Sequence, residues 1–575
     1  MIPFFESKKA TANFAFCKDL THGTIRLPKK GSMQTTADNN QLPRSGDLKQ
    51  CLLSPLIVGV LLSLMFLLMS SSGWHKNFSM DEPHNLRYGY DVLTKGPLAE
   101  TDGQRMPVFA LHALACQSYG CASEIMLDRP WRQLWIRLPS MLFTLALGLL
   151  VWYWCRKLYG STAALGALFL YALNPTLLAH GKEITSDAIT SFFVVLTVFL
   201  FWKWRDTKKH LFFYLSAIAT GIAIVTKFSA ILLFFILPLI LILQVALKKN
   251  FRINLPVLWT ILKKSIIFLL LVWLVINGAY LFRGSFESTR SYAWQSRYFQ
   301  NLAKKTDFPI PFPRIFVRGL DYSHLITEHS EYGRGNNYVL GHRHRKGRDY
   351  AYPLMILLKT PLGFFIILLA ALAASRTRKD LPISEAPAVY LWVPFGVWLL
   401  FFSSFCDIQV GIRYILPGYV FLILIAGKAF QDIGGRTKAA VLGAAALWYL
   451  LSVLSYHPHY MSYFNELIGA RINAYKYLAD SNLDWEDKDY YIKKWEKEHP
   501  GIRYQTHPEA MRDPRPGFFL MPANFYVGVF NQDEYAWLRE FKPLAHITYS
   551  HYLIYAGADE LALALKKHPI TGVKK

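Results

Sequence analysis

The sequence predicts an α-helical polytopic membrane protein with a small α/β domain at its C-terminal end. The chain combines 53% hydrophobic residues and a mean hydropathy of +0.21 with a formal net charge of +24. Apolar and charged residues must therefore occupy separate segments. Long runs without a charged residue alternate with short basic connections, and the chain becomes polar after Tyr456. These features exclude a soluble enzyme and a disordered basic tail.

Eleven charge-free runs are candidate spans, because a spanning helix needs about 20 mostly apolar residues and tolerates charge poorly at its centre. They are residues 51–74, 138–155, 158–179, 188–202, 211–226, 228–247, 265–282, 360–375, 386–406, 414–427 and 439–456. The first run is expected to be a signal anchor rather than a cleaved signal peptide. Met33 is an alternative start of the chain.

Basic residues concentrate in five connections between these runs. The connections are 156–157, 203–209, 248–264, 376–379 and 428–438. Positive charge favours the cytoplasmic side, so we expect all five inside the cell, together with the segment 1–50, whose polar composition predicts disorder. An odd number of spans then leaves the C-terminus outside. The predicted location is the inner or plasma membrane of the cell.

Three regions follow from this topology: the cytoplasmic segment 1–50, a membrane domain 51–456 with outer loops 75–136 and 284–352, and an outer domain 457–575. In the outer domain we expect helices near 487–498 and 559–567, and strands at 517–521 and 546–555. Cys116 and Cys121 fall in the first outer loop. They form either a disulfide or two packed free thiols.

Two adjacent acids, Asp81 and Glu82, follow the first span. Pro83 suits the first turn of a helix, so the acids are expected at the start of a short helix on the outer membrane surface. Its apolar stripe would be Leu86, Tyr90 and Leu93. A helix cap explains one acid at this position more easily than two acids with a histidine, His84, close behind.

A second polar cluster follows the third run. His180, Glu183 and Asp187 recur at helical spacing, so we expect one helix face to turn them toward the first loop, the alternative being a solvated connector. A metal site here lacks the tight His/Cys spacing that would support it. Lys227, Lys359 and Arg413 each lie beside the outer end of a run. Such cations suit the phosphate of an anionic lipid, either bound specifically or as nonspecific headgroups, and nucleic acid is not an expected partner.

Six motifs in these regions resemble the membrane glycosyltransferases of the GT-C fold, the dolichyl-phosphate-mannose protein mannosyltransferase-like group. They are DEPHNLRYGY (81–90), WIRLPSMLF (135–143), HGKEITSDA (180–188), LLKTPL (357–362), GIRYILPGY (411–419) and YFNELIGARINAYKYLADSNLDW (463–485). The motifs occur in order, which makes the set more specific than any member.

The resemblance implies an inverting glycosyltransferase with a polyprenyl-phosphate-linked sugar as donor and a protein or glycolipid as acceptor, working at the lipid bilayer. It implies Asp81 as the catalytic base, with Glu82 as its neighbour. The predicted substrate-binding residues are His84, Arg105, Arg137, Lys182, Glu183, Asp187, Lys227 and Arg413. No cofactor is predicted, and a divalent metal stays an open alternative. A lipid transporter or flippase is the alternative function, and it would favour ionisable residues in the middle of spans.

Overall fold

A computed structural model describes residues 45–96, 107–117, 130–246, 255–329, 337–376, 388–485, 488–507, 509–530 and 534–570. The chain divides into two compact units, residues 1–60 and residues 61–575. Arg105 and Cys121 lie outside the described residues, as does the predicted N-terminal segment up to residue 44. Cys116 is disulfide-bonded, as one of the two expectations for this residue requires.

Each of the eleven charge-free runs contains an apolar helix. The helices are α2 (Ser45–Gly73), α6 (Pro130–Tyr159), α7 (Ser161–Ala172), α9 (Asp187–Thr207), α10 (His210–Thr226), α11 (Leu233–Ala246), α12 (Leu255–Ala279), α16 (Leu362–Arg376), α17 (Val389–Ser404), α18 (Leu416–Gly427) and α19 (Arg436–Leu454). Within the described residues, seven helices are long and apolar enough to cross a membrane, or eight if one bent pair counts as a span. The prediction of a helical polytopic membrane protein is confirmed.

The run 360–375 contains α16, but the helix that comes directly before it was not predicted from the sequence. Helix α15 (Ala351–Lys359) precedes α16, and the two axes meet at 107°. The break falls at Thr360 and Pro361, where proline lacks the backbone donor that a continuous helix needs. The charge rule ended the run at Lys359 and therefore missed α15.

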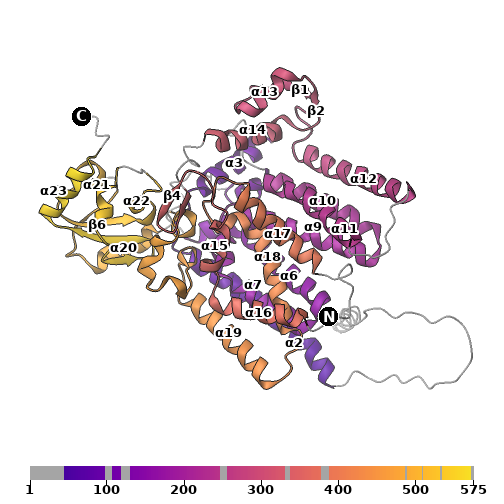
Figure 1. Cartoon of the computed structure of the whole chain (residues 1–575), viewed down its shortest axis with the longest axis horizontal. Coiled ribbons are helices and arrows are strands. Elements are labelled where there is room, and N and C mark those ends of the chain that lie inside the picture. The colour runs from indigo at the N-terminus through magenta and orange to yellow at the C-terminus, as the bar shows by residue number, and fades with distance from the viewer. Residues whose placement is uncertain are drawn as a thin grey trace, which may run out of the picture. The chain divides into compact units, whose positions relative to one another are not determined.

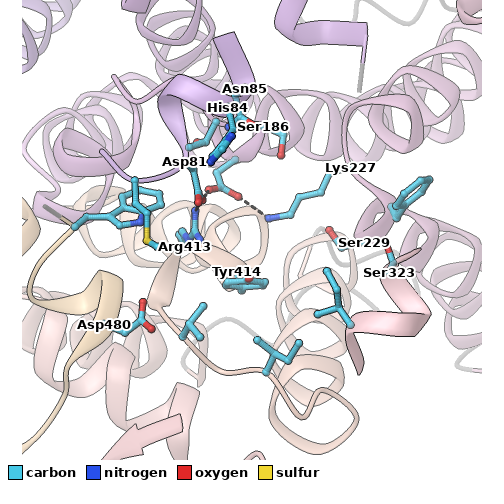
Figure 2. Close-up of a pocket in the computed structure, with 18 of the residues that line it drawn as sticks. Asp81, His84, Asn85, Ser186, Lys227, Ser229, Ser323, Arg413, Tyr414 and Asp480 are labelled. Atoms are coloured by element: carbon cyan, nitrogen blue, oxygen red, sulfur yellow. Dashed lines mark hydrogen bonds and ion pairs between the residues drawn. The ribbon is translucent and has the colours of Figure 1, made fainter. Parts of the chain in front are cut away.

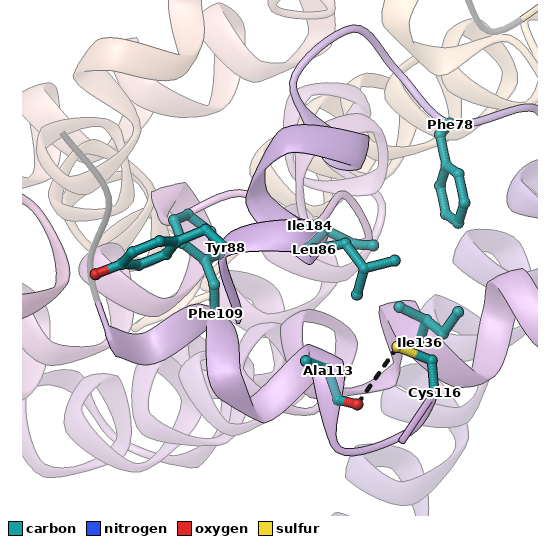
Figure 3. Packing of buried hydrophobic residues seen from close by; sticks show 8 residues of the cluster. All are labelled: Phe78, Leu86, Tyr88, Phe109, Ala113, Cys116, Ile136 and Ile184. Atoms are coloured by element: carbon teal, nitrogen blue, oxygen red, sulfur yellow. Dashed lines mark hydrogen bonds between the residues drawn. The ribbon is translucent and has the colours of Figure 1, made fainter. Parts of the chain in front are cut away.

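The first outer loop is anchored by a cluster of buried apolar side chains (Figure 3). Helix α3 (Glu82–Lys95) begins where the sequence predicts, and η1 (Pro107–Phe109) and α4 (Ala110–Ala113) follow it. The cluster consists of Phe78, Leu86, Tyr88, Phe109, Ala113, Cys116, Ile136 and Ile184. It joins α3 to α6 and to the connector before α9. Burial of each large side chain contributes about 1.5–3 kcal/mol, so the loop has a fixed position on the helices.

The second outer segment and the short connections add small elements. They are α8 (Pro175–His180), η2 (Phe228–Leu232), β1 (Glu287–Ser288), η3 (Thr289–Ser291), α13 (Arg297–Lys305), β2 (Pro309–Ile310), α14 (Arg314–His329), β3 (Asn337–Val339), β4 (His342–His344), η5 (Ile412–Ile415), η6 (Lys428–Phe430), η7 (Tyr460–Ser462), η8 (Glu466–Ile468), η9 (Arg471–Lys476) and η10 (Asp480–Asn482). Figure 1 shows α9, α10 and α11 side by side, with α12 against α10.

The C-terminal part contains a four-stranded sheet of order β5-β6-β8-β7, visible around the β6 label in Figure 1. Strands β5 (Tyr504–Gln505) and β6 (Gly517–Pro522) are parallel, whereas β8 (His551–Ala556) is antiparallel to β6 and to β7 (Ala545–Ile547). The accompanying helices are α20 (Asp489–Glu498), α21 (Glu509–Arg512), α22 (Ala523–Tyr526), η11 (Trp537–Glu540) and α23 (Ala558–Lys567). The prediction of a small α/β part is confirmed.

Candidate active site

A cavity of about 690 Å³ lies where several segments that connect the helices meet (Figure 2). Its wall comes from the start of α3, the connector before α9, the junction of α10 with η2, helix α14, the segment 406–414, and the turn 480–485. The charged side chains in this wall are Asp81, Asp187, Lys227, Arg413 and Asp480, together with His84. The cavity therefore brings together residues that are far apart in the sequence and that carry both signs of charge.

Asp81 occupies the N-cap position of α3, but its side chain makes no capping hydrogen bond. Its Oδ2 instead lies 2.9 Å from Nη1 of Arg413, and the side chain is 43% exposed. The capping interpretation thus accounts for the position of Asp81 and not for the direction of its carboxylate. An exposed carboxylate facing a cavity is available to accept a proton.

Arg413 lies between two acids. Its Nη1 is 2.9 Å from Asp81 and 3.9 Å from Oδ2 of Asp187, and its guanidinium lies over the Trp485 ring at 4.1 Å from the centroid. A planar guanidinium held by stacking keeps a defined orientation. The side chain is therefore placed to contact an anion next to Asp81.

Lys227 follows directly after α10, where the backbone becomes extended. Its Nζ donates to Oδ1 of Asp187 at 2.5 Å and lies 4.8 Å from the centre of the Tyr414 ring. Asp187 is the first residue of α9, a position in which a carboxylate interacts favourably with the helix dipole. Asp187 thus holds Lys227 and Arg413 on the same side of the cavity.

Glu82 is fully buried and does not line the cavity. Arg137 donates to both of its oxygens, at 2.8 Å from Nε to Oε1 and 2.7 Å from Nη2 to Oε2. The backbone N–H groups of Ser79 and Ile184 donate to the same carboxylate. Burial raises the pKa of Glu82, and Arg137 opposes that rise. These four hydrogen bonds fasten the start of α3 to α6 and to the connector before α9.

Lys182 and Glu183 form a second buried ion pair behind the cavity wall. Glu183 also lies 3.8 Å from Arg137, so this pair joins the Glu82–Arg137 network. The expected helix face of His180, Glu183 and Asp187 is wrong, because α8 ends at His180 and α9 begins only at Asp187. The chain turns between these two helices. A β-carbon at Gly181 would overlap the carbonyl oxygen of Leu177 and the side chain of Thr144.

Sequence reasoning missed Asp480 and Trp485 as parts of the site. Asp480 lies in the left-handed region, with φ 57°, and burial raises its pKa to about 6. Trp485 packs on Arg413 and also contacts His180 edge-on. Both residues lie in the motif YFNELIGARINAYKYLADSNLDW (463–485), which carries part of the resemblance and is the signal that could have pointed to them.

Of the ten predicted site residues, His84, Asp81, Asp187, Lys227 and Arg413 line the cavity, and four contribute to the buried network beside it. Those four are Glu82, Arg137, Lys182 and Glu183. Arg105 is outside the described residues. In the part of the chain that the structure describes, no three His, Cys, Asp or Glu side chains come together in a way that suits a metal ion.

A carboxylate and two cations at one end of the helix bundle suit an anionic substrate. The family model described as dolichyl-phosphate-mannose-protein mannosyltransferase matches residues 130–275, about a quarter of the chain. This match confirms the resemblance seen in the sequence and the enzyme class, a glycosyltransferase. No curated protein sequence matches the chain.

Solved structures with similar arrangements include ArnT from Cupriavidus metallidurans bound to undecaprenyl phosphate, at 12% identity and a TM-score of 0.46, covering 90% of this chain and 99% of that one. The archaeal oligosaccharyltransferase AglB from Archaeoglobus fulgidus, in complex with an inhibitory peptide and a dolichol-phosphate, has 11% identity and a TM-score of 0.47, covering 76% and 60%. Arabinosyltransferase EmbB from Mycobacterium smegmatis has 12% identity and a TM-score of 0.34, covering 78% and 40%.

Proposed function

We propose that this protein transfers one sugar from a polyprenyl-phosphate carrier to a hydroxyl group of a protein or glycolipid, with inversion at the anomeric carbon. The observation that carries the proposal is the placement of the Asp81 carboxylate beside two cations, Arg413 and Lys227, in one cavity. The family that matches residues 130–275 is named for dolichyl-phosphate-mannose, which supports the class of donor.

In this proposal the acceptor hydroxyl attacks the anomeric carbon while its proton passes to Asp81. The new bond joins the acceptor oxygen to that carbon, and the bond from the carbon to the phosphate oxygen breaks. The electron pair leaves with the polyprenyl phosphate, whose charge Arg413 and Lys227 stabilise. A phosphate leaving group needs no general acid, so one carboxylate base and two cations suffice.

The ion pair between Asp81 and Arg413 gives this site an additional property. Nη1 of Arg413 donates a hydrogen bond to Oδ2 of Asp81 at 2.9 Å. The phosphate of a polyprenyl-phosphate sugar that accepts a hydrogen bond from the same Nη1 competes with the Asp81 carboxylate. Binding of the donor therefore releases the carboxylate for the acceptor hydroxyl. Glu82 and Arg137 act in this scheme as positioning residues, since they hold the backbone that carries Asp81. His84 lines the cavity next to Asp81 and is proposed to contact substrate.

We also propose that the protein resides in the inner or plasma membrane, with its N-terminus in the cytoplasm and the cavity and C-terminal domain outside. The basic connections between spans support this orientation. Cysteines placed singly at the exposed positions Thr437 and Arg515 distinguish the two sides. An impermeant thiol reagent applied to intact cells should raise labelling above that of the parent protein only for the cysteine at position 515. Labelling at position 437 alone would reverse the proposed orientation.

The catalytic proposal is tested with purified protein and a panel of polyprenyl-phosphate sugars, by following release of the lipid phosphate in the presence of acceptor. We expect Asp81→Asn to lower kcat by roughly 10²–10⁴-fold, because general-base catalysis contributes about that factor. Asp91→Asn is the matched control, since Asp91 lies on the same helix and pairs with Lys95 at the surface. Activity of Asp81→Asn equal to that of the control would remove Asp81 as the base.

A further inference from the structure

Asp480 has a left-handed backbone conformation, which is uncommon for residues other than glycine and which aspartate adopts more readily than most. Its φ of 57° lies in the left-handed region, where a β-carbon is disfavoured and glycine is the usual residue. Residues kept in such conformations concentrate at functional sites, because the surrounding structure must hold them there.

Contacts from three segments hold this backbone in place. The N–H of Asp480 donates to Oδ1 of Asn524 at 2.7 Å, and the N–H of Asp484 donates to the carbonyl of Asp480 at 3.0 Å. The hydroxyl of Ser481 donates to the carbonyl of Val410 at 2.9 Å. These contacts hold the turn 480–484 against α22 on one side and against the segment before η5 on the other. They also set the direction of the Asp480 side chain.

The Asp480 carboxylate lines the cavity and has spare hydrogen-bonding capacity. Its Oδ1 accepts from the N–H of Ser481 at 2.5 Å. Among the described residues, Oδ2 accepts no hydrogen bond and Asp480 takes part in no ion pair, because Arg413 is paired with Asp81 and Lys227 with Asp187. A carboxylate with a free oxygen in a cavity wall can accept hydrogen bonds from hydroxyl groups.

The two sides of the cavity differ in character. Figure 2 shows Asp480 on one side of the Arg413 and Tyr414 pair and Ser229 with Ser323 on the other. Phe228 adjoins Ser229 in the chain and Ile326 follows Ser323 by three residues on α14, whereas Asn524 accepts a hydrogen bond from the N–H of Asp480. An isoprenoid chain suits the side of Ser229, and hydroxyl-rich groups suit the side of Asp480.

We propose that Asp480 binds hydroxyl groups of a sugar at the reacting end of the cavity and so determines specificity. The inference rests on the proposed function. The hydroxyls belong either to the transferred sugar of the donor or to the acceptor, which offer the same chemistry. The strained turn exists, in this view, to direct the carboxylate to those hydroxyls.

Asp480→Gly tests this directly, because glycine adopts the observed φ without strain and removes only the side chain. We expect a melting temperature close to that of the wild type, because relief of the disfavoured φ offsets loss of the hydrogen bond from the N–H of Ser481. We expect a KM raised roughly 10- to 100-fold, as for loss of a hydrogen bond to a charged group. Asp480→Asn keeps an acceptor oxygen and tolerates the left-handed region, so it should retain part of the wild-type affinity. Thr548→Gly is the matched control, since Thr548 has φ 55° and lies outside the cavity.

The two KM values separate the sources of the hydroxyls. A rise confined to the polyprenyl-phosphate sugar assigns Asp480 to the transferred sugar, and a rise confined to the acceptor assigns it to the acceptor. Wild-type transfer combined with unchanged values of both KM in Asp480→Gly would overturn the inference alone. Absence of transfer by the wild type with every donor in the panel would overturn the proposed function, and the inference with it.

Discussion

Asp81 and Glu82 are neighbours in the sequence with opposite environments. Asp81 is 43% exposed beside Arg413, while Glu82 is fully buried and accepts hydrogen bonds from Arg137, Ser79 and Ile184. Successive residues at a helix start point about 100° apart, so only one of the two faces the cavity. Breaking a buried pair such as Glu82–Arg137 costs about 3–5 kcal/mol. Asp81 is therefore the acid that can reach a substrate, whereas Glu82 positions the start of α3.

His112 gives the first outer loop a dependence on pH. The imidazole is buried between α4 and α6, with Nδ1 2.8 Å from the carbonyl of Ile136 and Nε2 3.3 Å from the hydroxyl of Ser140. Burial lowers the pKa of His112 to about 4, from an ordinary value of 6.5. Below pH 6.5 the unfolded chain binds a proton that the folded chain refuses, so stability falls as the pH decreases toward 4.

We therefore expect the loop to lose about 3 kcal/mol of stability between pH 6.5 and pH 4, at about 1.4 kcal/mol per unit of pKa. Melting temperatures of the purified protein across this range measure the loss. His112→Gln keeps a donor and an acceptor and should flatten the pH dependence, whereas replacing the exposed His499 in the same way should leave it unchanged. If the melting temperatures of the wild type and of His112→Gln fall equally between pH 6.5 and pH 4, His112 is not the source of the pH dependence.

At the scale of elements, hydropathy predicted the helices well and their bends poorly. All eleven runs contain helices, because an apolar stretch without charges has few other ways to satisfy its backbone in a membrane. The bend between α15 and α16 escaped the prediction, since the charge rule began the run after Lys359, the last residue of α15, and so left that helix out. Its Nζ is buried and donates to the carbonyls of Met461 and Asn482.

The candidate site was also predictable only in part. The cations Lys227 and Arg413 sit at the ends of charge-free runs, so their depth followed from the sequence. The pairing of Glu82 with Arg137 depends on the angle at which α3 meets α6, which no local pattern encodes. The role of Asp480 depends on a backbone conformation fixed by Asn524, more than forty positions later.

Gly89 sets how closely α3 approaches η1. A β-carbon at this position would overlap the carbonyl group of Phe109. Gly89→Ala should therefore displace α3, lower stability by about 1–3 kcal/mol as overpacking does, and reduce activity by shifting Asp81. Melting temperature and transfer rate measure the two effects.

Gly396→Ala is the matched control for this substitution. Gly396 lies within α17, and a β-carbon there meets no atom within 4 Å. Since alanine is favoured over glycine in a helix, the control should be as stable as the wild type or more so. Equal stability of the two variants would mean that the loop adapts to the extra carbon without cost.

At the scale of the molecule, the cavity depends on outer segments that meet around one turn. Residues 480–485 carry Asp480 and Trp485, and the turn is tied to η5 through the amide oxygen of Asn482, which accepts from Ile412 at 3.1 Å. Helix α20 reaches the first loop, where Asn77 donates to Asp489 at 2.6 Å. The C-terminal part of the chain therefore contributes directly to the candidate site.

Asn524 is the residue through which this dependence is tested. Its Oδ1 accepts from the N–H of Asp480 at 2.7 Å and its Nδ2 donates to the carbonyl of Asp484 at 3.2 Å, so it spans the turn.

Asn524→Ala removes this partner from both backbone groups, and each such loss costs about 1–3 kcal/mol. We expect a lower melting temperature and a fall of about tenfold or more in transfer, since a small displacement of groups at a reacting centre costs up to about 10²-fold. Gln505→Ala, on the edge strand β5, removes two exposed hydrogen bonds, one to the carbonyl of Asp513 and one from the N–H of Arg515, and should change neither quantity. Transfer by Asn524→Ala at the wild-type rate would show that the site forms without this contact from the C-terminal domain.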